Sequence, residues 1–364
     1  MKTLRYGYST GTCAAAACKA ALLKLLNEED VQKVVITLPV GSSVEIPVKK
    51  AILEGAGATA EVVKDAGDDP DVTHGISICS HVELLNKPEI IIMGGQGIGQ
   101  VTKPGLAVPV GEAAINPVPR KMITTALQEL LPTGWGARAS ISAPEGEKVA
   151  RKTMNPRLGI MGGISILGTS GLVRPMSQEA YLDSLIPQIR QAQALGHKTL
   201  VLTPGGMGAR MAAENGIHPE AVVQTSNFIG AMLEECAHHG VEEILLFGHI
   251  GKIVKVAGGI FNTHSKVADA RREILAVHAA LLGAPLKAIQ EIMEVNTMDA
   301  AVGLITDFHL QAVYASLAAA ASQRCQARLG EGIIIGTVLY ALDGTILGFD
   351  ETASKLGGRM GWSL

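Results

Sequence analysis

Aromatic side chains are scarce in this chain, with five Phe, five Tyr and two Trp making up 3% of 364 residues. Proteins that bind single-stranded nucleic acid without sequence preference stack bases on aromatic rings, so a surface of that kind is not expected. A large excess of charge of either sign is also lacking, because 31 Lys and Arg nearly balance 34 Asp and Glu to leave a formal net charge of −3. The basic surplus typical of nucleic-acid binding is therefore absent.

Cysteine and long apolar runs are also scarce. The five cysteines are scattered and contain no C-x-x-C pair, so we predict buried thiols in a reducing compartment and no metal site. No apolar run could span a bilayer without a charge or glycine in it. Lys19 and Lys24 interrupt the apolar part of the N-terminus, which argues against a signal peptide. We expect a cytoplasmic protein that does not contact a membrane.

What the chain has in abundance is small and aliphatic residues, with 47% hydrophobic residues and 42 glycines. This composition is typical of an α/β enzyme with many tight loops, and the length favours two domains. The pattern of predicted elements changes near Pro156, after which strand and helix units repeat. We therefore predict an α+β domain with a mixed sheet over residues 1–155, and a Rossmann-like α/β domain with a parallel sheet and a terminal hairpin over residues 156–364.

The first domain opens with a helix start. Thr10 and Thr12 lie among small residues just before an alanine-rich run, which is typical of a helix N-terminus that binds an anion. A helix that is only well capped has the same pattern, so both interpretations stay open. Strands are predicted at 34–39, 44–48, 58–64, 76–83 and 89–93, and a helix at 121–131.

Two loops of the first domain could bind ligands. The glycine-rich stretch 94–120 holds Lys103 and Arg120 beside prolines, which fixes two cations where the backbone can approach a ligand. It does not lead into a helix directly, so a dinucleotide-binding loop is not indicated. The acidic stretch 64–71 could hold a hard cation, but a solvated turn fits better because the spacing of an EF-hand loop is missing.

The second half alternates strands and helices, which predicts a parallel sheet. Glycine-bearing turns follow three of its predicted strands, at 168–171, 203–206 and 248–251. We expect these turns to meet at the carboxyl edge of the sheet and to form the ligand site. Strands are predicted at 160–167, 199–202, 222–224 and 244–247, helices at 177–195, 228–239, 265–282, 285–293, 297–305 and 309–328, and a hairpin at 332–349.

Several of these motifs together resemble the CbiD family. They are GYSTGTCAAA at 7–16, VTKPGL at 101–106, AINPVPR at 114–120, and the longer stretches 162–174 and 248–271. The similarity covers nearly the whole chain with the motifs in order. The stretch TPGGMG at 203–208 departs from the Gly-Asn-type loop of relatives.

The resemblance implies methyl transfer from S-adenosylmethionine to C1 of cobalt-precorrin-5B in the anaerobic cobalamin pathway. Cobalt enters only as part of the substrate. The macrocycle is acidic at its rim and calls for dispersed cations and helix N-termini. The resemblance is compatible with contacts to neighbouring enzymes of the pathway. The oligomeric state stays open.

The expected roles of individual residues follow from the resemblance together with their places in the glycine and proline loops. For the methyl donor we expect Gly168, Thr169, Ser170, Gly171, Thr203 and Gly205. For the macrocycle we expect Thr10, Thr12, Lys103, Arg120, Arg174, Lys252 and Lys255. His249 and His264 are candidates for axial contact with cobalt or for proton handling, although a structural hydrogen-bonding role suits either, and Glu145 and Asp269 are candidate bases.

Two other classes of protein fit part of the sequence. An acyl or phosphoryl transferase could use the residues around Thr12 and Cys13, and would need a nucleophile with a nearby base. A non-catalytic carrier would bind the tetrapyrrole without any affinity for the donor. A gain of one methyl group on the macrocycle separates the methyltransferase from the carrier.

Overall fold

The computed structural model describes residues 4–28 and 30–362. Contacts divide the chain into two compact units, Met1–Ala180 and Tyr181–Leu364. This boundary lies later in the chain than the domain boundary that the sequence predicts near Pro156. The reason is that two short strands after residue 156 pair with strands of the first unit, β10 with β8 and β11 with β1. These strands are β1 (Gly7–Tyr8), β8 (Gln100–Val101), β10 (Ile160–Met161) and β11 (Leu172–Val173).

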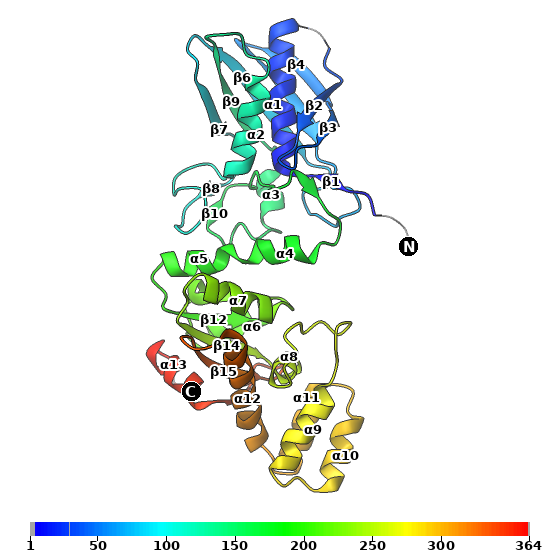
Figure 1. The fold of residues 1–364 in the computed structure, drawn as a ribbon, viewed down its shortest axis with the longest axis vertical. Coiled ribbons are helices and arrows are strands. Elements are labelled where there is room, and N and C mark those ends of the chain that lie inside the picture. The colour runs from blue at the N-terminus through cyan, green and yellow to red at the C-terminus, as the bar shows by residue number, and fades with distance from the viewer. Residues whose placement is uncertain (1–3, 29, 363–364) are drawn as a thin grey trace. The chain divides into compact units, whose positions relative to one another are not determined.

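The first unit is built on a mixed five-stranded sheet in the order β4-β5-β6-β9-β7, in which only β7 and β9 run parallel. Helices α1 and α2 lie side by side on this sheet (Figure 1). Alanines on α1 are fully buried, since their small side chains let the helix approach the strands closely. The elements are α1 (Thr10–Asn27), β2 (Lys33–Thr37), β3 (Ser43–Pro47), β4 (Lys50–Glu54), β5 (Gly57–Val63), β6 (Ser77–Leu85), β7 (Ile90–Gly94), α2 (Pro117–Gln128), β9 (Gly136–Ser142) and α3 (Gly146–Ala150).

The second unit has a five-stranded sheet in the order β13-β12-β14-β15-β16. The first four strands are parallel, and β16 runs antiparallel to β15, which confirms the terminal hairpin. The sheet strands are β12 (Thr199–Thr203), β13 (Val222–Gln224), β14 (Glu243–His249), β15 (Ile334–Tyr340) and β16 (Ile346–Phe349). Both units are thus of the mixed α/β kind, with parallel and antiparallel pairing.

Helices supply the rest of the second unit's core. Helices α6 and α13 contact the sheet, and one core cluster joins their apolar residues to Phe247 and Trp362. Helix α12 packs on α8, β15 and β16. The helices are α4 (Gln178–Leu185), which begins at the unit boundary, α5 (Pro187–Ala194), α6 (Gly206–Glu214), η1 (Pro219–Ala221), α7 (Ile229–His238), α8 (Ile250–Ala257), α9 (Arg271–Leu281), α10 (Leu286–Glu294), α11 (Met298–Asp307), α12 (Ala312–Leu329) and α13 (Glu351–Arg359). No helix in the described ranges is long and apolar enough to cross a membrane.

Four expectations from the sequence need correction. The predicted strand 160–167 is not part of the parallel sheet, because β10 pairs with β8 and residues 164 and 166 bridge to 98 and 115 in the first unit. The predicted helix 177–195 is two helices, with Pro187 opening the second. The helix expected from residue 265 begins only at Arg271. The segment after β16, which the sequence left without structure, forms α13, capped by the Asp350 side chain.

Candidate functional site

The turn from β14 into α8 is the point where the second unit can bind a ligand. Strand β14 is almost wholly buried, and α8 begins at once after His249. The Nδ1 atom of His249 accepts a hydrogen bond from the backbone N–H of Gly251 at 3.1 Å, so the imidazole caps the helix. The strand therefore ends in a fixed turn, at the sheet edge where α/β proteins bind ligands.

The other ring nitrogen of His249 is also engaged. Its Nε2 lies 3.1 Å from Oδ1 and 3.0 Å from Oδ2 of Asp299 on α11. Because Nδ1 accepts from Gly251, the ring proton sits on Nε2 and points to this carboxylate. Asp299 in turn accepts from the backbone N–H of Leu342 at 2.8 Å. His249 thus holds α8, α11 and the β15–β16 turn together, which is the structural role that the sequence left open for it.

A cavity of about 330 Å³ lies beside this turn. Lys252 reaches into it and donates to Oδ1 of Asn227, an atom that also accepts from Oγ1 of Thr263 at 3.2 Å. Partial burial lowers the pKa of Lys252, and the nearby Lys255 lowers it further. The cavity residues are Asn227, Gly251, Lys252, Lys255, Thr263, His264, Ser265 and Arg271.

Lys255 gives the cavity a second positive charge. Its side chain is only 2% exposed, and Nζ donates to the carbonyl oxygens of Thr263 at 3.2 Å and Ala268 at 2.8 Å. Burial lowers the pKa of Lys255, while Asp269 opposes that shift. These two carbonyl groups accept from the ammonium but do not neutralise it, so the wall of the cavity favours an anion.

Asp269 and Arg271 form a bidentate pair at the edge of this cavity, with both N–H···O distances at 2.7 Å. The hydrogen bonds from Arg271 lower the pKa of Asp269 to about 2. A carboxylate with so low a pKa is a poor general base at neutral pH. Asp269 therefore orients Arg271, which lines both this cavity and a neighbouring one of about 260 Å³.

His264 also lines the larger cavity. Its Nδ1 accepts from the backbone N–H of Lys266 at 3.1 Å, which places the ring proton on Nε2. Of the two candidate histidines, His264 is the one that borders the open space. Its role in proton handling or metal contact stays a prediction.

The glycine turn after β12 is open. Thr203 itself is fully buried, and a Cβ on Gly208 would lie 1.6 Å from its hydroxyl oxygen. Gly205 has a φ of 145°, and a Cβ added to it would meet nothing within 4 Å. An added Cβ on Gly206 would have Gln224 as its nearest neighbour, at 3.8 Å. Room for a ligand at the N-terminus of α6 thus lies over Gly205 and Gly206.

The turn 168–171 belongs to the first unit and packs against the start of α1. The Thr10 hydroxyl accepts from the N–H of Leu167 and donates to backbone carbonyls, and the Thr12 hydroxyl donates to the carbonyl of Gly171 at 2.6 Å. A Cβ on Gly168 would lie 2.3 Å from Oγ of Ser9. These contacts use Thr10 and Thr12 to hold a loop, which favours the capping interpretation of this helix start over the anion site.

The first N–H groups of α1 are likewise occupied. Gly11 donates to the carbonyl of Leu167 at 3.0 Å, and Thr12 donates to Oγ of Ser9 at 3.2 Å. Cys13 follows in the core, where burial raises its pKa to about 12. A buried thiol with so high a pKa is a poor nucleophile. The acyl or phosphoryl transferase built on these residues is therefore not supported.

The remaining candidates of the first unit lie in its loops. Arg120 donates to the carbonyl of Ile115 at 2.9 Å and pairs with Glu112, so it organises the loop that precedes α2. Lys103 packs over Gly159, whose added Cβ would lie 2.5 Å from Cγ of the lysine. Arg174 and Glu145 are exposed. Contact of these four side chains with substrate stays a prediction.

The acidic stretch 64–71 is occupied by the protein's own groups. Lys64 is 1% exposed and pairs with Asp71 at 2.6 Å. Asp65 pairs with Arg5 at 2.5 Å, and Asp68 accepts from the backbone N–H of the same arginine at 2.8 Å. This use of the carboxylates favours a structural turn over a cation site.

The sequence patterns did not single out five residues of the second unit's site. Asn227, Thr263, Ser265 and Arg271 line the larger cavity, and Asp299 holds His249. Asn227 and Asp299 come from segments far from 248–271 in the chain, so no local motif joins them. Arg271 lies within the stretch that carried the family resemblance, and its basic charge near Lys252 and Lys255 was the available signal.

Fold and site define an α/β protein with a cationic cavity beyond the carboxyl end of a parallel strand. The chain belongs to the CbiD family: the CbiD family model matches residues 1–175, and that of the CbiD C-terminal domain matches residues 262–351. A relative from Moorella thermoacetica is 51% identical over 100% of this chain and 99% of its own length. A second from Desulfitobacterium hafniense is 48% identical over 96% of this chain and 91% of its own. Both are named cobalt-precorrin-5B C(1)-methyltransferase.

A solved structure is also similar. It is described as the cobalamin biosynthesis protein CbiD from Archaeoglobus fulgidus. It is 31% identical and covers 73% of this chain and 83% of its own, with a TM-score of 0.39.

Proposed function

We propose that this chain methylates C1 of cobalt-precorrin-5B, with S-adenosylmethionine as the methyl donor. The observation that carries the proposal is the agreement with relatives of that name over essentially the whole length of both chains. The five free cysteines and the balanced charge agree with action in the reducing cytoplasm. Contacts with neighbouring pathway enzymes stay predictions.

The cavity beside α8 is the proposed site for an acidic edge of the macrocycle. Lys252 and Lys255 hydrogen-bond only to neutral oxygens among their contacts described above, so their charges are available to a carboxylate. Arg271 and His264 add donors at the rim of the same cavity. Charge-assisted hydrogen bonds of this kind are worth more than neutral ones in a partly buried site.

The turn 203–208 is the proposed place for the methyl donor, in a domain that we interpret as Rossmann-like. Gly205 and Gly206 leave room over the N-terminus of α6, where the helix dipole favours an anionic group of a ligand. The order of four parallel strands with α6 and α8 following β12 and β14 supports this interpretation. The turn 168–171 is a weaker candidate because it packs against α1.

S-adenosylmethionine, when bound, supplies a methyl group activated by its sulfonium. The S–CH₃ bond breaks as the bond to ring carbon forms, and the sulfur leaves as a neutral thioether. A catalytic nucleophile in the protein is not required for this displacement. The chain has to align the donor with C1 and exclude water, so binding residues account for most of its contribution.

The test is anaerobic incubation of the full chain with cobalt-precorrin-5B and S-adenosylmethionine, followed by mass spectrometry of the macrocycle. The proposal expects a gain of one methyl group and equimolar S-adenosylhomocysteine. A folded sample that binds the macrocycle but neither binds the donor nor changes the macrocycle's mass would overturn the proposal in favour of a carrier.

A further inference from the structure

Three side chains of the second unit gather at the edge of the sheet opposite to the cavity. His197 lies just before β12, and His218 and Glu220 lie just before β13. The cavity and the turn 203–208 lie at the carboxyl ends of β14 and β12, whereas this cluster lies at the amino ends of two neighbouring parallel strands. The length of β12 separates the two edges, roughly 15 Å for five residues.

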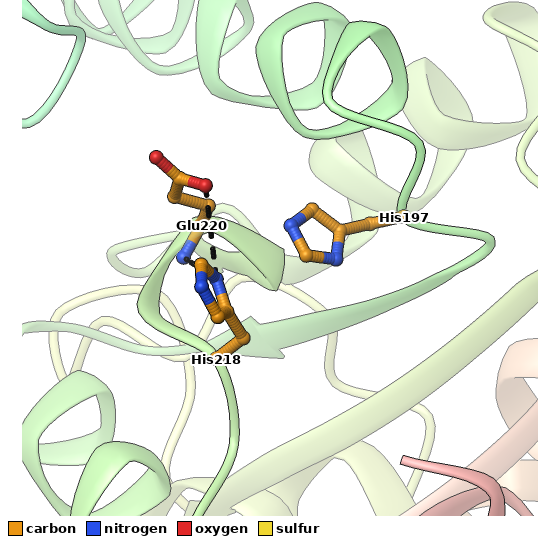
Figure 2. Close-up of side chains that lie close together, drawn as sticks. All are labelled: His197, His218 and Glu220. Atoms are coloured by element: carbon orange, nitrogen blue, oxygen red, sulfur yellow. Dashed lines mark hydrogen bonds and ion pairs between the residues drawn. The ribbon is translucent and has the colours of Figure 1, made fainter.

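The ligand atoms of the three side chains are close to one another. One nitrogen from each histidine and one carboxylate oxygen of Glu220 all lie within 4.8 Å of each other, and Nδ1 of His218 is 3.7 Å from Oε2 of Glu220. The two imidazole rings have their centroids 5.2 Å apart. Figure 2 shows the ring of His197 directed toward the other two side chains. Ligands of a tetrahedral ion with bonds of about 2.0–2.1 Å are separated by roughly 3.3 Å, so modest side-chain rotations complete the set.

The backbone fixes where these side chains begin. Helix α5 ends with Gly196 at a φ of 88°, and the N–H of His197 donates back to Ala192 at 3.1 Å. Helix α6 ends in the same way, with Gly216 at a φ of 82° and the N–H of Ile217 donating to Ala212. Glycine in the left-handed region is required at both positions to close the helix. Each histidine is thereby placed directly after a closed helix end.

The local electrostatics favour a cation. Helices α5 and α6 both contact the short helix η1 that carries Glu220, and their carboxyl ends, which bear partial negative charge, come shortly before His197 and His218 in the chain. The Nδ1 atom of His218 accepts from the N–H of Glu220 at 3.3 Å, a long hydrogen bond. An ion bound at Nδ1 would replace this hydrogen bond, and an ion bound at Nε2 would leave it in place.

From this geometry we propose that His197, His218 and Glu220 bind one divalent transition-metal ion of the zinc class. Two imidazoles and one carboxylate are a donor set that suits Zn²⁺ and disfavours Mg²⁺ or Ca²⁺, which prefer oxygen ligands. The ion ties the starts of β12 and β13 together and stabilises the second unit, far from the proposed methyl-transfer site. Binding is independent of macrocycle and donor, so its failure would leave the proposed function intact.

The test is isothermal titration of the EDTA-treated full chain with ZnCl₂, beside thermal unfolding with and without Zn²⁺. We expect one Zn²⁺ per chain and a higher unfolding temperature with the ion. His197→Ala, His218→Ala and Glu220→Gln should each weaken binding by roughly tenfold or more. MgCl₂ should give no comparable heat.

His239→Ala is the matched control. His239 also sits near a second histidine and a glutamate, His238 and Glu235, but Arg190 lies 3.4 Å from its Nε2 and opposes a cation there. This variant should bind Zn²⁺ like the wild type. If a histidine variant unfolds, Zn²⁺ binding can still be tested with Glu220→Gln, because this substitution keeps the size of the side chain. Absence of Zn²⁺ binding to the wild type, or binding that survives His218→Ala and Glu220→Gln unchanged, would overturn the proposal.

Discussion

The Nε2 atom of His249 lies 3.0 Å from Oδ2 of Asp299, and this pair joins the end of β14 to the start of α11. With Nδ1 accepting from Gly251, the imidazole has both nitrogens in use. A histidine in a basic loop is readily taken for a catalytic group, but here its contacts place it in support of the lysine-bearing helix α8. Lys252 and Lys255 extend from that helix into the cavity.

His249 should therefore matter first for stability. His249→Asn keeps a side chain that can cap α8, whereas His249→Ala removes the cap, so we expect the alanine variant to be less stable by about 1 kcal/mol. Urea unfolding of both variants measures this difference. Equal free energies of unfolding would contradict the capping role.

Lys252 should contribute to binding of the macrocycle. Loss of a hydrogen bond to a charged group costs about 1.5–3 kcal/mol, so Lys252→Ala should raise KM for cobalt-precorrin-5B roughly tenfold or more. Lys287→Ala is the control, because Lys287 is 78% exposed on α10 and pairs only loosely with Glu291 at 3.8 Å. Steady-state kinetics under anaerobic conditions provide the comparison. An equal effect of the two substitutions would argue against a specific role for Lys252.

Gly206 should distinguish the two candidate donor loops. An added methyl group fits the protein at this position but projects into the space proposed for S-adenosylmethionine, so Gly206→Ala should weaken donor binding by roughly tenfold. Gly303→Ala, on α11 with nothing within 4 Å of the added Cβ, should leave it unchanged. Isothermal titration with the donor tests both.

The Thr169→Ala/Ser170→Ala double variant completes that comparison. If it abolishes donor binding while Gly206→Ala does not, the donor binds at 168–171 rather than at 203–208. If its affinity is unchanged, Thr169 and Ser170 are not donor ligands.

The buried pair of Lys64 and Asp71 should dominate the stability of its own loop. Asp71→Ala leaves the Lys64 ammonium, 1% exposed, without its carboxylate, so we expect a loss of about 3–5 kcal/mol. The double variant Lys64→Met/Asp71→Ala removes both charges and should recover part of that loss. Denaturant unfolding of the three proteins measures it. A double variant no more stable than Asp71→Ala would show that the uncompensated charge is not the cause.

Lys255 should give stability a dependence on alkaline pH. Burial lowers its pKa in the folded state, so the unfolded chain binds the proton more tightly than the folded chain does. The free energy of unfolding therefore rises with pH between the lowered pKa of Lys255 in the folded state and the ordinary lysine pKa of about 10.4. Below that window the buried ammonium is fully charged, and its full destabilising effect is present. As the pH rises through this window, the unfolding free energy of the wild type should therefore increase relative to that of Lys255→Met. A difference that stays flat between neutral pH and pH 10 would contradict this.

Local patterns in the sequence were enough for most elements. The helix after Ser9, three of the five strands of the first sheet, the alternation around β12 and β14, and the hairpin at the Asp343–Gly344 turn are all present as expected, whereas the strands β4 and β9 were missed. Each depends on periodicity, capping or turn chemistry within about ten residues. The break at Pro187 and the helix α13 were misjudged although their signals, a proline and the Asp350 cap, are equally local.

The sequence by itself determined the family, the two-part organisation and the basic stretch around Lys252, because these are carried by motifs and composition that need no partner. Only the tertiary structure decided what each side chain does. It turned Thr10 and Thr12 toward backbone carbonyls and moved the turn 168–171 into the first unit. It also brought Asn227 to Lys252 and Asp299 to His249. The physical reason is that side chains find their hydrogen-bond and packing partners in segments far apart in the chain. No single segment contains the information that predicts its partner.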